Sequence, residues 1–159
     1  MPSKPLEPKW IIDTREQTPL PMPNAIRGTL YAGDYSFAGA EELFSVERKS
    51  IPDLVKSVTW DRERFEHECL RLRGYRFKRL IIVGTEREVW EEKYRSKASP
   101  KAVMHSLWAF EVRYDLPVIF AATPIIAAKL IRKWGVYFRR EAVYKVSQAI
   151  TKAATREEA

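Results

Sequence analysis

The sequence has 159 residues, of which 28 are Lys or Arg and 21 are Asp or Glu, so its formal net charge at pH 7 is +7. Its hydrophobic fraction of 45% and its charged fraction of 31% are typical of a globular domain and exclude a disordered or fibrous chain. A single cysteine, Cys69, excludes a disulfide framework and a thiolate zinc site.

The first part of the chain predicts a tail, a buried strand and a loop. Residues 1–9 contain three prolines and are expected to form an extended tail. Trp10–Asp13 is nearly continuously apolar, which is typical of a strand buried on both faces. The sequence Thr-Pro-Leu-Pro-Met-Pro at 18–23 cannot form the interior of a helix, so we expect a loop there.

An antiparallel hairpin and a short helix are predicted next. Residues 35–38 and 43–47 are rich in aromatic and β-branched side chains, and a Gly-Ala-Glu-Glu connection separates them. Ser50 is a suitable N-cap for the short helix that follows, because its hydroxyl can accept a hydrogen bond from a free backbone N–H of the first turn.

Helices and strands are expected to alternate through the middle of the chain. The spacing of apolar residues predicts a helix over 60–73. Continuous apolar runs predict buried strands at 80–84 and 117–121. Between them, a helix is expected to begin at Ser99-Pro100, since serine is a good N-cap and proline fits the first helical turn.

Two further helices are expected at the C-terminal end. The first begins at Pro124 and turns Ile126 toward the core. The second is amphipathic and spans 141–153, and residues 154–159 are expected to form a tail. Early antiparallel strands followed by α/β alternation predict one α/β domain over 10–153, in which a mixed central sheet is flanked by helices.

The segment Glu47-Arg48-Lys49 carries the most concentrated chemistry of the sequence. Strand alternation places Glu47 and Lys49 on the same face, at the end of an interior strand where ionised groups are costly unless they are paired or bound to metal. A simple Glu47–Lys49 salt bridge is the alternative interpretation. Arg48 points the opposite way, so we expect it to pair with Asp53 or another acid.

Two more carboxylates are expected near the same edge of the sheet. Asp34 begins the neighbouring strand of the hairpin, and Asp13 ends the first strand. Converging carboxylates repel each other unless a cation lies between them, and an all-oxygen pocket suits magnesium or manganese. Each aspartate alone is more typical of an ordinary loop edge. Together with Glu47 and Lys49, they predict a metal-dependent phosphodiesterase site.

The motif Gly33-Asp34, a hairpin, and Glu47-Arg48-Lys49-Ser50-Ile51-Pro52-Asp53 resembles the signature of the XPF-type structure-specific endonucleases. Ile12-Asp13-Thr14-Arg15-Glu16 is similar to the opening strand of that family, and Arg64-Phe65 to a pair in the helix after its signature. The resemblance covers roughly residues 9–140. It implies a restriction-endonuclease-like core of the PD-(D/E)XK type.

The resemblance also implies a divalent-metal-dependent DNA endonuclease with Asp34, Glu47 and Lys49 as catalytic residues. Asp34, Glu47 and the backbone carbonyl of Arg48 would bind Mg²⁺ or Mn²⁺, and Asp13 would support that metal or a second one. Lys49 would orient or activate the attacking water. The groups expected around the metal site, or against phosphate, are Arg15, Glu16, Arg48, Asp53 and Arg64.

The positive charge is confined to the C-terminal part of the chain. Residues 1–94 hold 16 basic and 16 acidic side chains, whereas 95–159 hold 12 and 5. A local basic excess favours a polyanionic partner, here DNA, although a solubilising surface is an equally weighted alternative. The candidate DNA contacts, for which a solvated helix face is the alternative, are Arg62, Lys129, Arg132, Lys133, Arg139 and Arg140.

The resemblance leads to expectations about substrate and partners. Members of the family commonly carry helix-hairpin-helix motifs after the nuclease domain, and we expect none within these 159 residues. DNA affinity is therefore expected to come from the domain itself or from a partner protein that supplies such motifs. Dimerisation in the family through the C-terminal half of the domain implies a homodimer, and the expected substrate is branched, flap or junction DNA in repair or recombination. The alternative is a non-catalytic nucleic-acid-binding or assembly module that retains the fold.

No apolar run approaches the roughly 18 residues of a membrane span, so we expect no membrane partner. The single cysteine favours an intracellular protein. The expected location is the cytoplasm of a bacterium or of a virus-infected host cell rather than the nucleus.

Overall fold

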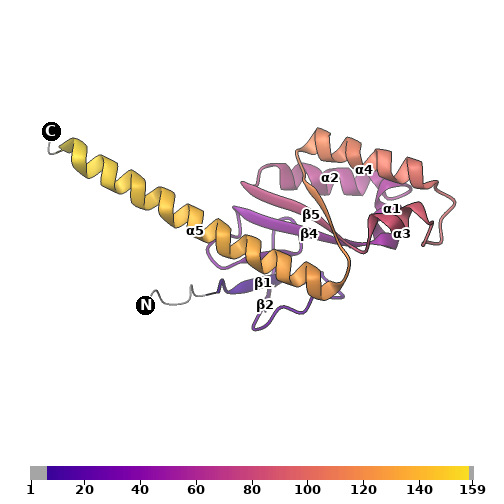
Figure 1. Cartoon of the computed structure of the whole chain (residues 1–159), viewed down its shortest axis with the longest axis horizontal. Coiled ribbons are helices and arrows are strands. Elements are labelled where there is room, and N and C mark those ends of the chain that lie inside the picture. Colours follow the sequence, from indigo (N-terminus) through magenta and orange to yellow (C-terminus); the bar gives the residue numbers. More distant parts are fainter. Residues whose placement is uncertain (1–6, 158–159) are drawn as a thin grey trace.

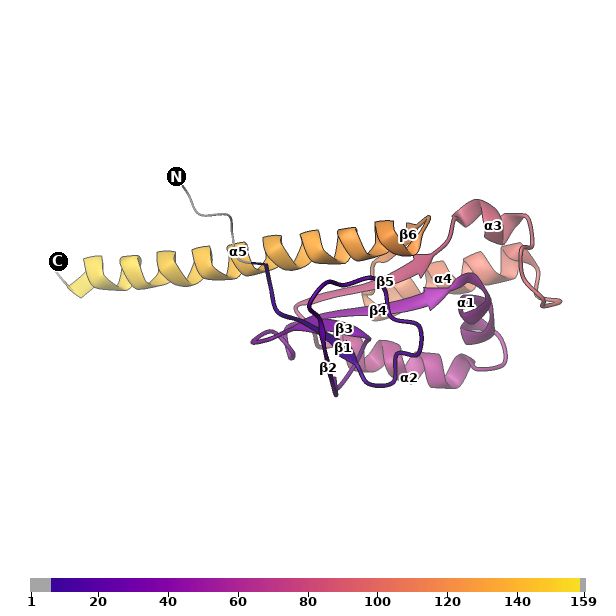
Figure 2. The ribbon, with the colours of Figure 1, turned by 90° about the horizontal axis from the view of Figure 1, so that it is seen from below.

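The computed structural model describes residues 7–157 and places one mixed sheet between two layers of helices (Figures 1 and 2). The elements, in chain order, are β1 (Trp10–Asp13), β2 (Ile26–Gly28), β3 (Tyr35–Phe37), β4 (Phe44–Ser50), α1 (Ile51–Val58), α2 (Arg62–Arg73), β5 (Phe77–Val83), α3 (Glu86–Trp90), α4 (Pro100–Tyr114), β6 (Val118–Ala121) and α5 (Pro124–Glu157). Of the expected tail at 1–9, residues 7–9 form no regular structure, and 1–6 lie outside the described residues.

The strand order in the sheet is β2-β1-β3-β4-β5-β6. β3 pairs antiparallel with both β1 and β4, whereas β4, β5 and β6 run parallel, as do β1 and β2. The α/β architecture with a mixed central sheet, predicted from the sequence, is therefore confirmed. The C-terminal ends of β4, β5 and β6 meet at one edge, which is where α/β sheets carry their sites.

The sheet separates two hydrophobic cores. On one face, α1, α2 and α4 pack against Leu80 and Ile82 of β5. On the other face, α5 packs against Ile81 of the same strand and against the aromatic side chains of β1, β3 and β4. Figure 2 shows α5 on one face and α1 and α2 on the other. The apolar run of β5 is continuous because successive side chains fill different cores.

Several local predictions are confirmed. β1 has the expected bounds, and β3 and β4 form the expected antiparallel hairpin. The Ser50 hydroxyl caps α1 by accepting a hydrogen bond from the Asp53 N–H, and Ser99 caps α4 by accepting one from the Ala102 N–H. These features depend on local signals, namely apolar runs and capping side chains, which the sequence carries directly.

The prediction of two C-terminal helices is wrong, because α5 is one helix of 34 residues that also includes 154–157 of the expected tail. Gly135 does not end it: a Cβ there would lie 2.3 Å from the Trp10 ring, so this glycine lets the ring pack against the helix. Ile126 is 48% exposed rather than inward, and Ala127 and Ala128 fill the core instead.

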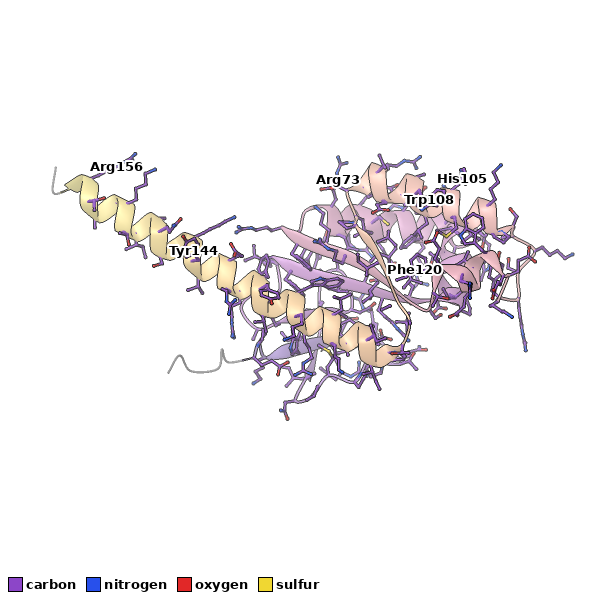
Figure 3. The ribbon with its side chains drawn as sticks, in the orientation of Figure 1. Arg73, His105, Trp108, Phe120, Tyr144 and Arg156 are labelled. Carbon is purple, nitrogen blue, oxygen red and sulfur yellow. The ribbon has the colours of Figure 1, made fainter. Side chains whose placement is uncertain are left out.

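The second half of α5 projects beyond the sheet (Figure 1). A helix of 34 residues is about 51 Å long, and Figure 3 shows Tyr144 and Arg156 on the part that leaves the domain. The larger apolar side chains along this part are exposed, namely Val143, Tyr144, Val146 and Ile150, and Tyr137 just before it is exposed as well.

Two elements were not predicted from the sequence. β2 has three residues and pairs only with β1, and α3 is a single helical stretch of five residues with Thr85 as its cap. Both are shorter than the windows over which apolar periodicity can be recognised.

Candidate active site

The hairpin of β3 and β4 brings Asp34 beside the C-terminal part of β4. The Asp34 N–H donates to the Val46 carbonyl at 2.9 Å, and the Arg48 N–H donates to Asp34 Oδ2 at 2.8 Å. In a strand the carbonyl of a residue points to the same side as its N–H, so the Arg48 carbonyl also lies on the Asp34 side. Gly33 permits this close approach: its φ is +77°, and a Cβ there would lie 2.0 Å from Ser45 Oγ.

Glu47 and Lys49 share the face of β4 that lies against α2. The Lys49 Nζ lies 3.3 Å from Glu47 Oε1, 3.5 Å from Glu68 Oε2 and 4.8 Å from the centroid of the Phe65 ring. Glu68 was not among the residues predicted from the sequence. Its position in the sequence could have indicated this contact, because Glu68 is next to Cys69 and about one turn after Phe65, at the border of the buried side of α2.

The electrostatics of this cluster favour an added cation. Burial, reinforced by the charge of Glu47, raises the pKa of Asp34 well above its ordinary value. Burial raises the pKa of Glu47 to about 7, although the charge of Lys49 opposes the shift. Burial alone would lower the pKa of Lys49, but the charges of Glu47 and Glu68 outweigh it and hold the pKa above its ordinary value. A cation between the two carboxylates would stabilise their ionised forms.

These side chains line a cavity of about 400 Å³ at the edge of the sheet. The cavity brings together nine of the residues predicted for the site: Asp13, Arg15, Glu16, Asp34, Glu47, Arg48, Lys49, Asp53 and Arg64. It also contains side chains that the sequence analysis did not select, among them Tyr31, Lys56, Glu68 and Arg71. Residues separated by nearly sixty positions in the chain thus form one polar pocket.

Asp13 lines this cavity, but its carboxylate is already occupied by hydrogen bonds. Oδ2 accepts from the N–H and the Nε of Arg15 at 3.0 and 2.8 Å, and Oδ1 accepts from the Leu30 N–H at 2.9 Å. Burial would raise the pKa of Asp13, but the hydrogen bonds from Arg15 and Leu30 outweigh it and lower the pKa. Asp13 therefore fixes the position of Arg15 at the rim of the cavity.

Arg48 pairs with an acid, as expected, and the acid is Glu16 rather than Asp53. The Arg48 Nη1 lies 3.7 Å from Glu16 Oε1. Asp53 is exposed in the first turn of α1, where its charge complements the helix dipole. This difference arises because β1 lies next to β3 and carries the loop with Glu16 across the end of the hairpin.

Arg62 does not line the cavity, and its role in DNA binding stays a prediction. Its Nη1 donates to the Val58 carbonyl at 3.2 Å and to Ser106 Oγ at 3.1 Å. The guanidinium lies 4.5 Å from the centroid of the Phe110 ring. Arg62 therefore connects α1, α2 and α4.

The remaining predicted DNA contacts lie on α5, on the opposite face of the sheet from α1 and α2 (Figure 2). Arg132 forms an ion pair with Glu7, and its Nη2 lies 2.7 Å from Glu7 Oε2. No member of this group of α5 cations lines the cavity: Lys129, Arg132, Lys133, Arg139 and Arg140.

The donor set fits a small divalent cation that prefers oxygen ligands. Asp34 Oδ1 and Glu47 Oε2 accept no hydrogen bond from the part of the chain that the structure describes. Across residues 7–157, no group of three or more His, Cys, Asp or Glu is arranged to hold a metal ion. The expected support of the metal by Asp13 stays a prediction. The fit consists of two carboxylates and the Arg48 carbonyl, with water completing the coordination as Mg²⁺ prefers.

Sequence comparison identifies a family match over most of the chain. Residues 12–133 match the family described as the ERCC4 domain. A comparison with curated proteins finds no match. No helix within residues 7–157 is long and apolar enough to cross a membrane.

Two solved structures share the fold. "XPF from Aeropyrum pernix" is 23% identical with a TM-score of 0.64, and the match covers 80% of this chain and 60% of that chain. "XPF from Aeropyrum pernix, complex with DNA" is 22% identical with a TM-score of 0.66, and the match covers 84% and 66%. The chain therefore spans less than two thirds of the length of either. The XPF-like nuclease fold implied by the sequence motif is confirmed.

Proposed function

This chain belongs to the ERCC4 domain family, and from that membership we propose that it is a divalent-metal-dependent DNA endonuclease. Members of the family are typically metal-dependent endonucleases. The observation that carries the proposal is the convergence of Asp34, Glu47 and Lys49 on one polar cavity at the edge of the sheet.

Asp34, Glu47 and the Arg48 carbonyl would hold Mg²⁺ or Mn²⁺ in this site. When bound, such an ion supplies positive charge that lowers the pKa of a water and stabilises negative charge on a phosphate oxygen. The Arg48 N–H bond to Asp34 Oδ2 fixes the orientation of that carboxylate, so its other oxygen stays directed into the cavity.

Lys49 would orient the attacking water and offset negative charge that develops on the phosphate. Its ammonium is held by Glu47 and Glu68, and its raised pKa keeps it protonated at neutral pH. A protonated lysine can donate hydrogen bonds to water and phosphate oxygens but cannot accept a proton. In the metal-free state, the structure thus favours the orienting role over that of a general base.

The cations at the rim of the cavity would position the DNA backbone. Arg15 is fixed by Asp13, and Arg64, Arg71 and Lys56 line the same cavity. Such contacts set the register of the backbone without reading sequence. We propose DNA as the substrate because a solved structure with this fold is a complex with DNA. The resemblance of the sequence motif to structure-specific endonucleases supports the finer proposal of branched, flap or junction DNA, in repair or recombination.

We further propose that the chain acts as a homodimer or with a partner protein. The support for this is the row of exposed apolar side chains on the projecting part of α5. The non-catalytic alternative, a binding or assembly module, is less favoured because Asp34, Glu47 and Lys49 are all present and face one cavity.

The test compares wild type with Asp34→Asn, Glu47→Gln and Lys49→Ala on flap, fork, single-stranded and duplex DNA with Mg²⁺ or Mn²⁺. The acid variants should lose more activity than the roughly 10- to 100-fold that a change behind a metal ligand costs. They should still bind DNA in Ca²⁺. Glu91→Gln, at the exposed residue that caps the C-terminal end of α3, is the matched control and should cut normally. Unchanged cutting by both acid variants would exclude this site, and binding without cutting by wild type would favour the non-catalytic module.

A further inference from the structure

We propose that Trp60 is a stacking platform for an unpaired DNA base beside the candidate active site. This inference rests on the proposed endonuclease function and adds to it the side chain that would contact the single-stranded arm of the junction substrate already proposed. The sequence analysis did not select Trp60, which it placed inside a helix. In the structure it lies in the turn between α1 and α2.

The position of Trp60, rather than its exposure alone, carries the inference. The side chain is 76% exposed, and single exposed apolar residues are common on protein surfaces. However, the Lys56 Nζ lies 4.6 Å from the centroid of the indole ring, and Lys56 also lines the cavity that contains Asp34 and Glu47. One cation therefore contacts both the ring and the active-site cavity.

A second hollow, of about 440 Å³, lies along Trp60 and joins the first through shared side chains. Arg64 and Arg71 line both hollows. A strand that leaves the active-site cavity along these cations would pass the indole ring. Two acids, Asp61 and Glu63, also line the second hollow. Asp61 lies 3.8 Å from the Arg64 Nη1 and is partly neutralised by it.

An aromatic ring among cations is the combination that binds single-stranded nucleic acid. The cations follow the backbone, and the ring stacks on a base without regard to its identity. Lys56 supports one face of the indole by a cation–π contact, which leaves the opposite face for a base. The bases of an intact duplex are already stacked on their neighbours, so only an unpaired base offers a free face to Trp60.

The experiment uses the full chain and a junction substrate with a single-stranded arm at the cut. Trp60→Ala is compared with Trp60→Phe, which keeps a ring, and with Trp90→Ala, an exposed tryptophan on α3 away from both hollows. Affinity is measured in Ca²⁺ and kcat/KM in Mg²⁺. A matched substrate carries abasic nucleotides in the arm, so that the base is removed and the backbone stays.

The expected result is a loss of about 5- to 150-fold for Trp60→Ala on the arm substrate, the range for one base–aromatic stack. Trp60→Phe should keep most of the binding, and Trp90→Ala should match wild type. The abasic arm should weaken wild type by a similar factor and leave Trp60→Ala unchanged. Thermal unfolding of the Trp60 variants should match wild type because the side chain is exposed.

Two results would overturn this inference: normal affinity of Trp60→Ala for the arm substrate, or an equal effect of the abasic arm on wild type and Trp60→Ala. Either result leaves the proposed function intact if cutting still requires Asp34. Cutting that is independent of Asp34 overturns the proposed function instead. If wild type binds but does not cut, the affinities in Ca²⁺ still decide the role of Trp60.

Discussion

The geometry at Gly33 allows a quantitative test of how the site is positioned. Gly33→Ala places a methyl group 2.0 Å from Ser45 Oγ and 3.3 Å from the Val46 carbonyl oxygen, at a φ of +77°. The left-handed backbone costs a non-glycine residue about 1–2 kcal/mol. The collision with β4 adds about 1–3 kcal/mol, as for overpacked cores. We expect a total loss of about 2–5 kcal/mol.

Gly39→Ala separates these two contributions. Gly39 has a similar φ of +87°, but nothing lies within 4 Å of the position that its Cβ would take. Its alanine variant should lose only the backbone part, about 1–2 kcal/mol. Urea unfolding of both variants, monitored by tryptophan fluorescence, gives the difference directly, and that difference is the steric part.

The collision has an identified partner, so it can be partly relieved. Ser45 Oγ donates a hydrogen bond to the Ala32 carbonyl at 2.8 Å, and a shift of this hydroxyl would break that bond. Gly33→Ala combined with Ser45→Ala should therefore be less destabilised than the sum of the two single variants. Equal losses for Gly33→Ala and Gly39→Ala, or strict additivity with Ser45→Ala, would refute the steric explanation.

Three further predictions concern other buried positions, namely Asp13, Cys69 and Gly135. Asp13→Asn should lower the free energy of unfolding by about 2 kcal/mol at pH 7, since it weakens hydrogen bonds to a buried carboxylate. Because the pKa of Asp13 is lowered in the folded state, the stability that its carboxylate contributes is present above pH 4. In urea unfolding, the difference in stability between wild type and variant should therefore narrow as the pH falls below that value. Burial raises the pKa of the Cys69 thiol to about 12, so labelling by a disulfide reagent at pH 8 should occur only in urea. Rapid labelling of the native protein would contradict the burial. The free energy of unfolding should also fall as the pH rises above 9, because the folded state disfavours the thiolate. Gly135→Ala should destabilise the protein because the new Cβ would lie 2.3 Å from the Trp10 ring. This outweighs the roughly 1 kcal/mol by which alanine normally stabilises a helix relative to glycine. A raised midpoint in thermal unfolding would show instead that the ring can move aside.

Local signals in the sequence were enough to predict the part of the fold that carries the acids. The apolar run of β1, the hairpin and the capping residue Ser50 are each encoded within a few neighbouring residues. They place Asp34 and Glu47 in the same region, because an antiparallel hairpin fixes which residues are opposite each other. In the structure, the pairing of Tyr35 with Val46 sets this register.

The parts that were missed depend on contacts between distant segments. Glu68 and Arg62 lie on the same helix, but their partners come from β4 and α4, which periodicity within α2 does not reveal. The hydrogen bond from the Leu30 N–H to Asp13 likewise comes from a distant loop, while the role of Asp13 beside a metal stays a prediction. Trp60 was expected within a helix, and α2 begins only at Arg62.

The alternation of side chains along β5 also has a consequence for how the molecule melts. Leu80 and Ile82 belong to one core and Ile81 to the other, so neither layer can detach without stripping apolar surface from the same strand. β5 in turn is bonded along the whole of β4, which holds Glu47 and Lys49. Both layers and the edge that carries the candidate active site should therefore unfold in a single transition, and amide hydrogens of β4 and β5 should exchange only with global opening.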